Sequence, residues 1–238
     1  MKAHTLTTTF ESLGVPASLV KVLAAEGKTE AFEIQAATLA DTLAGGGVLG
    51  CGETGSGKTL AFSIPVVARL AQAKAEGRIR RTSGAPTGLI LAPTRELATQ
   101  IAAAISPLAQ TENLVVTTVF GGVKQGRQVE AFRRGVDIVV ACPGRLEDLM
   151  GQGIVRLDKV QITVLDEADH MADLGFLPGV TRIMKATPAD GQRLLFSATL
   201  DNGVDVLARK FLHSPTLHSV DEASSPVPAM THHVFEVA

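Results

Sequence analysis

The segment from Gly52 to Thr59 restricts the fold of this chain more than any other stretch. Its sequence, Gly52-Glu-Thr-Gly-Ser-Gly-Lys-Thr59, has the Gly-x-x-x-x-Gly-Lys-Thr spacing of a phosphate-binding loop. The apolar run Val48–Cys51 before it predicts a strand, and Leu60–Ile64 after it predicts the first turns of a helix. Glycines in this context let backbone N–H groups surround phosphate oxygens, and the helix N-terminus adds partial positive charge. The alternative is a glycine-rich turn that carries a lysine by chance.

If the loop binds a nucleoside triphosphate, its residues have distinct roles. Lys58 is predicted to reach the β- and γ-phosphates, and the hydroxyl of Thr59 is predicted to be a ligand of Mg²⁺. The predicted nucleotide-binding residues of the loop are Gly52, Glu53, Thr54, Gly55, Ser56, Gly57, Lys58 and Thr59.

Short runs rich in Val, Ile and Leu recur along the chain between amphipathic stretches. The predicted strands are Val48–Cys51, Gly88–Ala92, Leu114–Phe120, Asp137–Ala141, Gln161–Leu165, Arg193–Ser197 and Thr216–Val220. The predicted helices are Ala17–Ala25, Glu33–Leu43, Lys58–Ala75, Arg95–Leu108, Lys124–Arg133, Gly144–Met150, Leu177–Lys185 and Val204–Phe211. Most strands are apolar almost throughout, as burial on both faces of a parallel sheet requires. The alternation predicts an α/β fold, a doubly wound and mostly parallel sheet flanked by helices.

The length and composition are those of a globular protein. The chain has 238 residues, of which 45% are hydrophobic and 19% charged, enough to bury a sizeable core. We predict one domain over residues 1–220. Residues 221–238 are predicted to be a linker, because Ser-Ser-Pro-Val-Pro lies there. Thr231–Val237 then has a strand-like pattern, either the first strand of a further domain or a frayed terminus.

Charge and cysteine usage limit the partners and the compartment. The net charge of −2 provides no global positive field, so any nucleic-acid site must be a local basic patch. The long connection Lys74–Thr87 carries three arginines and is either a solvated loop or an RNA contact. Cys51 and Cys142 are far apart and predict neither a disulfide framework nor a zinc site. With no signal-peptide core and no membrane-length apolar run, the sequence predicts a cytoplasmic protein without membrane contact.

A second chemical signal follows the apolar run Gln161–Leu165. Asp166 and Glu167 come directly after this predicted strand, and carboxyl ends of strands face the ligand crevice in open α/β sheets. Asp166 is therefore predicted to hold Mg²⁺, and Glu167 to polarise the water that attacks the γ-phosphate. The alternative is that these acidic residues only cap a helix.

Six short motifs in order show that the chain resembles the DEAD-box RNA helicases. They are the phosphate-binding loop, Pro93-Thr-Arg-Glu-Leu-Ala98, Gly121-Gly122, Cys142-Pro-Gly-Arg145, Asp166-Glu-Ala-Asp169 and Ser197-Ala-Thr199. The resemblance covers nearly all of residues 10–220 and implies the first recombinase-like (RecA-like) domain of such a helicase. It implies ATP and Mg²⁺ as cofactors, with Lys58, Asp166 and Glu167 as catalytic residues.

The resemblance also implies an RNA path and a coupling element. The implied RNA-binding residues are Pro93, Thr94, Arg95, Gly121, Gly122, Pro143, Gly144 and Arg145. Strand-to-helix turns of this kind offer backbone N–H groups and arginines to phosphates, so RNA binding should be independent of base sequence and sensitive to salt. Asp169, Ser197 and Thr199 are implied to couple hydrolysis to strand separation. The alternatives are structural ion pairs of Arg95 with Glu96 and of Arg145 with Asp148, and plain strand-end capping by the two hydroxyls.

The chain departs from the family pattern at two places. Cys142 replaces a threonine, and a thiol is a poorer hydrogen-bond donor. In the segment that precedes the phosphate-binding loop in this family, Ala31 and Phe32 replace Pro and Thr, whereas Gln35 is kept. The resemblance implies that Gln35 binds adenine and that Phe10 packs over the base. The alternative for Gln35 is an ordinary surface position on a helix.

The resemblance further implies that a second recombinase-like domain supplies arginines to the γ-phosphate. No motif of such a domain follows residue 220, so we expect the chain alone to bind nucleotide weakly and to hydrolyse it barely. Two other hypotheses compete with the RNA helicase. One is a DNA-directed helicase or translocase of the same superfamily, and the other is a binding module that uses ATP as a switch without turnover.

Overall fold

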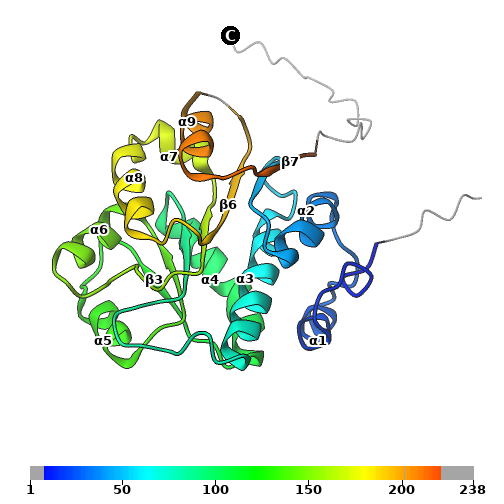
Figure 1. Ribbon diagram of the computed structural model, residues 1–238, viewed down its shortest axis with the longest axis horizontal. Helices are drawn as coiled ribbons and strands as arrows, with labels where there is room; N and C mark the ends of the chain where they lie inside the picture. Colours follow the sequence, from blue (N-terminus) through cyan, green and yellow to red (C-terminus); the bar gives the residue numbers. More distant parts are fainter. Residues whose placement is uncertain (1–7, 201, 221–238) are drawn as a thin grey trace, which may run out of the picture.

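A computed structural model describes residues 8–200 and 202–220, which form one central sheet covered by helices. The strands are β1 (Val48–Cys51), β2 (Gly88–Leu91), β3 (Val116–Val119), β4 (Ile138–Ala141), β5 (Ile162–Leu165), β6 (Gln192–Ser197) and β7 (Thr216–Ser219). The helices are α1 (Ala17–Ala25), α2 (Glu33–Ala44), α3 (Lys58–Ala75), α4 (Arg95–Thr111), α5 (Gly126–Arg134), α6 (Pro143–Gly151), α7 (Ala168–Asp173), α8 (Leu177–Ala186) and α9 (Asn202–Phe211). Figure 1 shows α1 and α2 at one end of the molecule and α5 and α6 at the other.

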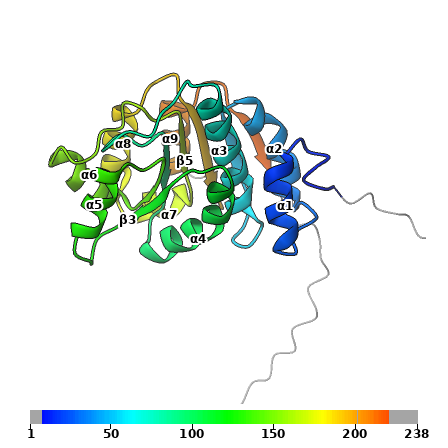
Figure 2. The same ribbon diagram turned by 90° about the horizontal axis from the view of Figure 1, so that it is seen from below.

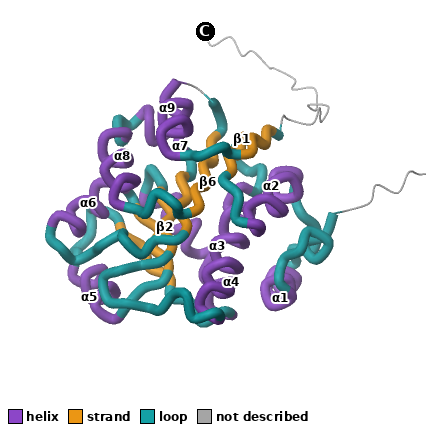
Figure 3. Tube along the Cα trace, viewed as in Figure 1, coloured by secondary structure: helices purple, strands orange, loops and turns teal. Residues whose placement is uncertain are grey.

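The seven strands are parallel and lie in the order β3-β4-β2-β5-β6-β1-β7. The chain steps across the sheet in one direction from β1 to β2 to β3, and then returns from β3 to β7. Crossovers between parallel strands are almost always right-handed, so this reversal places the later helices on the opposite face. Figure 3 shows the strands running between the helices, and Figure 2 shows the same arrangement from below. The predicted doubly wound α/β fold is confirmed.

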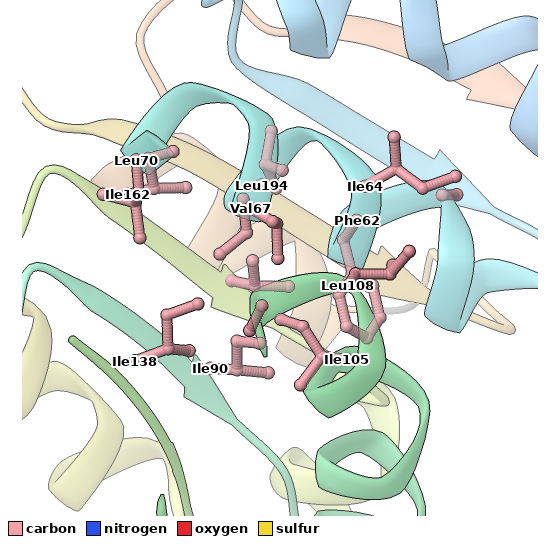
Figure 4. Packing of buried hydrophobic residues seen from close by; sticks show 14 of the residues in the cluster. Phe62, Ile64, Val67, Leu70, Ile90, Ile105, Leu108, Ile138, Ile162 and Leu194 are labelled. Atoms are coloured by element: carbon pink, nitrogen blue, oxygen red, sulfur yellow. The ribbon is translucent and has the colours of Figure 1, made fainter. Parts of the chain in front are cut away.

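Two hydrophobic cores lie on the two faces of the sheet. Helices α1 to α4 pack on one face, and α5 to α9 pack on the other. Successive strand residues alternate between them, so Ile90 joins the first core while Leu89 and Leu91 join the second. Figure 4 shows side chains of the first core, among them Phe62 and Val67 of α3 and Ile105 of α4. Each such fully buried side chain stabilises the fold by about 1.5–3 kcal/mol.

The predicted elements agree with the structure except at their ends and at one helix. All seven strands occur within two residues of their expected ends, and eight helices were predicted close to their observed bounds. The short helix α7 was not predicted. The residues 221–238, for which we predicted a linker and a strand, lie outside the described part of the chain. The division into a domain and a linker therefore stays a prediction.

The long basic connection before β2 has a structural anchor at the amino-terminal edge of the sheet. Arg81 donates from Nε to Oδ2 of Asp137 over 2.7 Å, and from Nη2 to the carbonyl oxygen of Asn113 over 2.7 Å. Asp137 is buried, whereas 34% of the Arg81 side chain remains accessible, so water shields this ion pair only in part. The connection thus lies at the edge opposite to the carboxyl ends of the strands. Of the two interpretations of this loop, RNA contact is not supported.

Two further arginines at the same edge line a cavity of about 510 Å³. Arg69 donates to the carbonyl oxygen of Leu43 in the last turn of α2, and Arg193 donates to that of Phe211 at the end of α9. Cations at helix C-termini compensate the partial negative charge there. These arginines therefore have a structural role. Among the described residues, no helix is long and apolar enough to cross a membrane.

Candidate functional site

The predicted phosphate-loop, catalytic, coupling and RNA-binding residues lie at the carboxyl-terminal edge of the sheet, in two neighbouring groups. The adjacent strands β5, β6 and β1 lead to this edge: Asp166 directly follows β5, Ser197 ends β6, and Gly52 directly follows β1. The adjacent strands β3, β4 and β2 lead to the segments 121–122, 142–145 and 93–95. A hydrogen bond from Asp166 N–H to the carbonyl oxygen of Leu91, 3.0 Å long, joins the two groups. The strand order thus separates the predicted nucleotide residues from the predicted RNA residues and keeps them on one edge.

The phosphate-binding loop is a turn whose backbone requires glycine. Gly55 and Gly57 have φ angles of 91° and 92°, in the left-handed region that side chains rarely adopt. Inside the loop, the Lys58 ammonium donates hydrogen bonds to the carbonyl oxygens of Gly52 and Glu53. Lys58 is only 8% exposed and begins α3. The loop therefore holds one buried cation at a helix N-terminus, as a phosphate site requires.

Asp166 is a buried acid close to this cation. Its side chain is 2% exposed, and burial raises its pKa to about 7. The charge of Lys58 opposes this rise, whereas the charges of Glu167 and Asp169 add to it. Glu167 follows with φ at 50°, a left-handed conformation that costs a non-glycine residue free energy and is found most often at functional sites. The phosphate-binding loop and the acids that follow β5 therefore lie close enough for their charges to interact. The sequence predicted that they would lie at one site.

Asp169 links α7 to the end of β6. Its Oδ2 accepts hydrogen bonds from the N–H groups of Ala198 and Thr199, each 3.1 Å long, and from the Thr199 hydroxyl over 3.3 Å. Its own N–H donates to the Ser197 hydroxyl over 3.2 Å. Partial burial works to raise the pKa of Asp169, but these hydrogen bonds and one from His170 N–H outweigh it and lower the pKa. The structure thus brings Ser197 and Thr199 into contact with Asp169, and their role in coupling stays a prediction.

Gln35 connects α2 to the phosphate-binding loop. It is 2% exposed, so the alternative of an ordinary surface position is wrong. Its Oε1 accepts from the N–H of Phe32 and its Nε2 donates to the carbonyl oxygen of Gly57, both over 2.9 Å. These two partners fix which end of the amide carries the oxygen. One N–H and one lone pair remain, which is the pattern that the edge of adenine can satisfy.

An apolar pocket of about 490 Å³ opens beside Gln35, within the size range of small-ligand sites. Phe10, Gly57 and Thr59 contribute to its wall. Phe10 is 2% exposed and belongs to the first core. It therefore contacts mainly other side chains, and only a small part of its ring faces the pocket.

Two of the segments predicted to bind RNA meet at Arg95. Its guanidinium carbon lies 5.3 Å from the ring centroid of Phe120, in cation–π contact. A Cβ atom at Gly122, where φ is 74°, would approach Nη1 of Arg95 to 2.6 Å. Glycine at this position therefore allows the arginine to lie against the turn. Thr94 caps α4 by accepting from Leu97 N–H over 3.2 Å. The stacked Arg95 remains oriented at the carboxyl edge.

The third segment joins them through Arg145. Nη1 of Arg145 donates to the carbonyl oxygen of Val123 over 3.2 Å, and its Nε lies 3.6 Å from Oδ2 of Asp148. The structural ion pair that we considered for Arg145 is therefore present. Cys142 is the N-cap of α6 but provides no side-chain cap hydrogen bond. Burial, followed by the charge of Glu96, raises the pKa of its thiol to about 11, so the thiol is neutral at pH 7.

The donor set at this edge fits a magnesium ion that is bound together with a nucleotide. No group of three or more His, Cys, Asp or Glu side chains could hold a metal within residues 8–200 and 202–220. Mg²⁺ is commonly held by one or two carboxylates, water and substrate phosphates, so such a group is not required. Burial raises the pKa of Asp166, and a bound cation would oppose this rise. Asp166 and Thr59 are the residues that would hold the ion.

Two residues near the site were not predicted as site residues. Phe32 lines the apolar pocket although it is 59% exposed. His170 lies one turn after Glu167, with Nδ1 3.3 Å from Oε2 of Glu167. The sequence signal for this contact was the spacing of three residues between Glu167 and His170, which are neighbours if the segment is helical. The helix α7 has only six residues, which is too short for a periodic pattern to reveal it.

A doubly wound sheet with a phosphate-binding loop at its carboxyl edge and an acid on a nearby strand defines the class of P-loop nucleotide-binding domains. Residues 25–207 match the family model described as DEAD/DEAH box helicase. The chain belongs to this family.

Curated relatives and a solved structure agree with this assignment. The chain is 44% identical over 203 residues to the DEAD-box ATP-dependent RNA helicase 3A, chloroplastic, of Zea mays, which covers 85% of this chain and 27% of that protein. It is 39% identical over 236 residues to the ATP-dependent RNA helicase RhlB of Pseudomonas syringae pv. tomato, covering 97% and 58%. A crystal structure of a DEAD box protein from Methanococcus jannaschii matches with a TM-score of 0.79 at 29% identity, covering 90% of this chain and 56% of that one. The chain thus spans 27% and 58% of the length of these two relatives.

Proposed function

We propose that this chain is the ATP-binding domain of an RNA helicase that couples ATP hydrolysis to RNA binding and local duplex unwinding. The observation that supports this most strongly is the convergence of Lys58 with Asp166. The charge of the lysine opposes the rise that burial causes in the pKa of the acid, although Lys58 begins α3 and Asp166 follows β5. A cation at the phosphate-binding loop and a carboxyl group on a neighbouring strand end are the groups with which P-loop enzymes bind a magnesium nucleotide.

The residues of the chain would divide the chemistry among them. Lys58 and the N–H groups of the phosphate-binding loop bind phosphate oxygens, and Lys58 stabilises the charge that develops on the transferring group. Thr59 and Asp166 would hold Mg²⁺, which supplies further positive charge at the phosphates when bound. Glu167 orients the attacking water. The link from Asp169 to Ser197 and Thr199 transmits the state of the γ-phosphate to the end of β6.

For RNA, we propose contacts to the phosphate and sugar backbone along the second group of segments. Arg95 is held by the Phe120 ring and lies against Gly122, and Arg145 joins the turn at Val123. Pro93, Thr94, Pro143 and Gly144 precede or open helices, so their neighbouring N–H groups can meet phosphates. The relatives named above are RNA helicases, which supports RNA over DNA as the substrate.

Full activity requires a second recombinase-like domain. The chain covers only part of the length of its relatives, which leaves room in those proteins for such a domain. Arginines supplied to the γ-phosphate increase turnover by roughly 10³–10⁵ in related enzymes. The chain alone is therefore proposed to bind ATP weakly and to hydrolyse it barely. RNA-stimulated turnover near that of complete helicases would contradict this part of the proposal.

Nucleotide binding is tested by two lysine variants on the same helix. Lys58 and Lys74 lie at opposite ends of α3, and Lys74 Nζ donates to the carbonyl oxygen of Asn113 at the amino edge. In calorimetric titrations with ATP and Mg²⁺, Lys58→Ala should reduce affinity at least about tenfold, the scale of one charge-assisted contact. Lys74→Ala should leave affinity unchanged. Equal binding by both variants would contradict a phosphate site at Gly52–Thr59.

RNA binding is tested by a matched pair of arginine variants. Arg95→Ala should weaken binding of single-stranded homopolymer RNA and reduce the slope of log affinity against log salt by about 1. Arg80→Ala is the control, because this exposed arginine lies in the connection at the opposite edge. The loss should be similar for different homopolymers, since phosphate contacts carry no base information. The same loss in both variants would show that no local RNA site exists at Arg95.

A further inference from the structure

Phe32 is an aromatic side chain that remains mostly exposed. With 59% of its surface accessible, it is more exposed than the other large hydrophobic side chains of the described residues. Its backbone is nevertheless fixed, because its N–H donates to Oε1 of the buried Gln35. An exposed ring on a fixed backbone loses little conformational entropy when a ligand covers it.

The ring lies beside the phosphate-binding loop. A Cβ atom built at Gly57 would lie 2.6 Å from Cδ2 of Phe32 and 2.5 Å from Nε2 of Gln35. The glycine that precedes Lys58 is therefore in contact with both side chains. Phe32, Gln35 and Thr59 all line the same apolar pocket of about 490 Å³. A ligand whose phosphates occupied the loop would have this pocket available for its other end.

The second aromatic residue of the pocket, Phe10, packs inside the protein. Phe10 is 2% exposed and packs in the first core, so most of its ring already contacts other side chains. Of the two phenylalanines that line the pocket, Phe32 has the larger uncovered aromatic surface. Base–aromatic stacking requires such a surface and depends little on the identity of the base.

We propose that Phe32 stacks on the base of the bound nucleotide and provides affinity for the base, while Gln35 selects which base is bound. This proposal rests on the proposed nucleotide site and adds to it a residue that replaces the family's threonine. Stacking and selection then have different signatures. Phe32→Ala should reduce the affinities for ADP and for GDP by the same factor. We expect a reduction of about 5- to 10-fold, which corresponds to the lower end of the range for base–aromatic stacking. Inorganic tripolyphosphate, which has no base, should bind both proteins equally.

The absence of Trp and Tyr from the chain allows a direct test. Phe32→Trp introduces a single indole, whose fluorescence should change saturably with ADP and remain constant with tripolyphosphate. Val206→Trp is the matched control, because Val206 is 57% exposed but lies on α9, which packs on the other face of the sheet. Its fluorescence should not respond to either ligand. Calorimetry on the unsubstituted chain provides the reference affinity for ADP.

The outcomes separate this proposal from the proposed function. If the unsubstituted chain binds ADP, while Phe32→Trp gives no response and Phe32→Ala retains full affinity, stacking on Phe32 is overturned and the nucleotide site stands. If Phe32→Ala weakens ADP but not GDP, Phe32 selects the base instead of stacking on it, and the proposal is also overturned. If the unsubstituted chain binds neither ADP nor tripolyphosphate, the nucleotide site itself fails, and the stacking proposal fails with it.

Discussion

The side-chain amide of Gln35 donates a 2.9 Å hydrogen bond to the backbone carbonyl oxygen of Gly57 and so joins α2 to the phosphate-binding loop. The same amide accepts from the N–H of Phe32, which fixes the start of α2. A group that contacts the base would therefore also hold the turn that contacts the phosphates. This arrangement makes base binding and loop conformation mutually dependent.

The first prediction concerns this bond. Gln35→Glu keeps an oxygen for the N–H of Phe32 but replaces the donor to Gly57 with an oxygen that faces the carbonyl. Because the position is 2% exposed, the free energy of unfolding should fall by about 1–3 kcal/mol in urea titrations. ATP affinity should fall at least about tenfold, since the variant also lacks the donor for adenine. The control is Gln110→Glu, an exposed glutamine near the end of α4 and away from this pocket, which should change neither quantity.

The second prediction concerns the uncapped start of α6. Cys142 has the extended backbone of an N-cap, but its neutral thiol makes no cap hydrogen bond. Cys142→Thr places a hydroxyl there that can accept from a free N–H of the first turn, which stabilises proteins by about 0.5–1 kcal/mol. The midpoint of thermal unfolding should rise by about 1–4 °C. Cys142→Val has nearly the shape of threonine without the hydroxyl, so an equal rise in this variant would contradict capping as the cause.

The third prediction concerns the link between Asp169 and Thr199. A double-mutant cycle with Asp169→Asn and Thr199→Val should give a coupling free energy of about 0.5–1 kcal/mol in urea titrations at pH 7. The pKa of Asp169 is lowered in the folded state, so its contribution is present above the unfolded pKa of about 3.9 and is lost as pH falls below that value. The cycle should therefore give no coupling at low pH. The control pair is Asp169→Asn with Thr99→Val, because the Thr99 hydroxyl donates to Arg95 on the surface of α4.

Most of the fold follows from local sequence because burial on both faces leaves a clear mark. The strands β2, β4 and β5 consist almost wholly of apolar residues, since each contacts a core on either side of the sheet. The phosphate-binding loop is equally local, because its left-handed turns require glycine at Gly55 and Gly57. Parallel strands then bring Asp166 to the same edge as Lys58. These parts of the site could therefore be predicted.

The parts that could not be predicted depend on which side chains the tertiary structure covers. Nothing in the segment around Phe32 indicates that its ring stays exposed while Phe10, another phenylalanine of the same pocket, is buried. The ion pair of Arg81 with Asp137 joins residues from a loop and from the start of a strand, and no periodic pattern relates them. For Arg145, the sequence left two alternatives open, RNA binding and an ion pair with Asp148. The ion pair could be foreseen because residues three apart are neighbours on any helix.

The last prediction follows from the burial of Asp166. Its pKa in the folded state is about 7, whereas an unfolded aspartate has a pKa of about 3.9. Between these values the folded state holds a proton that the unfolded state lacks, so the free energy of unfolding falls as pH rises from about 4 to about 7. Asp166→Asn removes this titration. In metal-free buffer, its stability relative to the unsubstituted chain should therefore increase over that interval, by roughly 1–4 kcal/mol, and stay constant at higher pH.

The pH dependence is the decisive quantity, because any fixed cost of placing an amide at Asp166 is the same at every pH. Asp173→Asn on α7 is the control, since this carboxylate is exposed and its replacement should change the free energy of unfolding by no more than about 0.5 kcal/mol. A flat difference for Asp166→Asn would show that the acid is ionised without penalty in the folded state. The charge of Lys58 alone would then compensate the charge of Asp166. The inference that a bound cation is needed to stabilise the ionised Asp166 would be wrong.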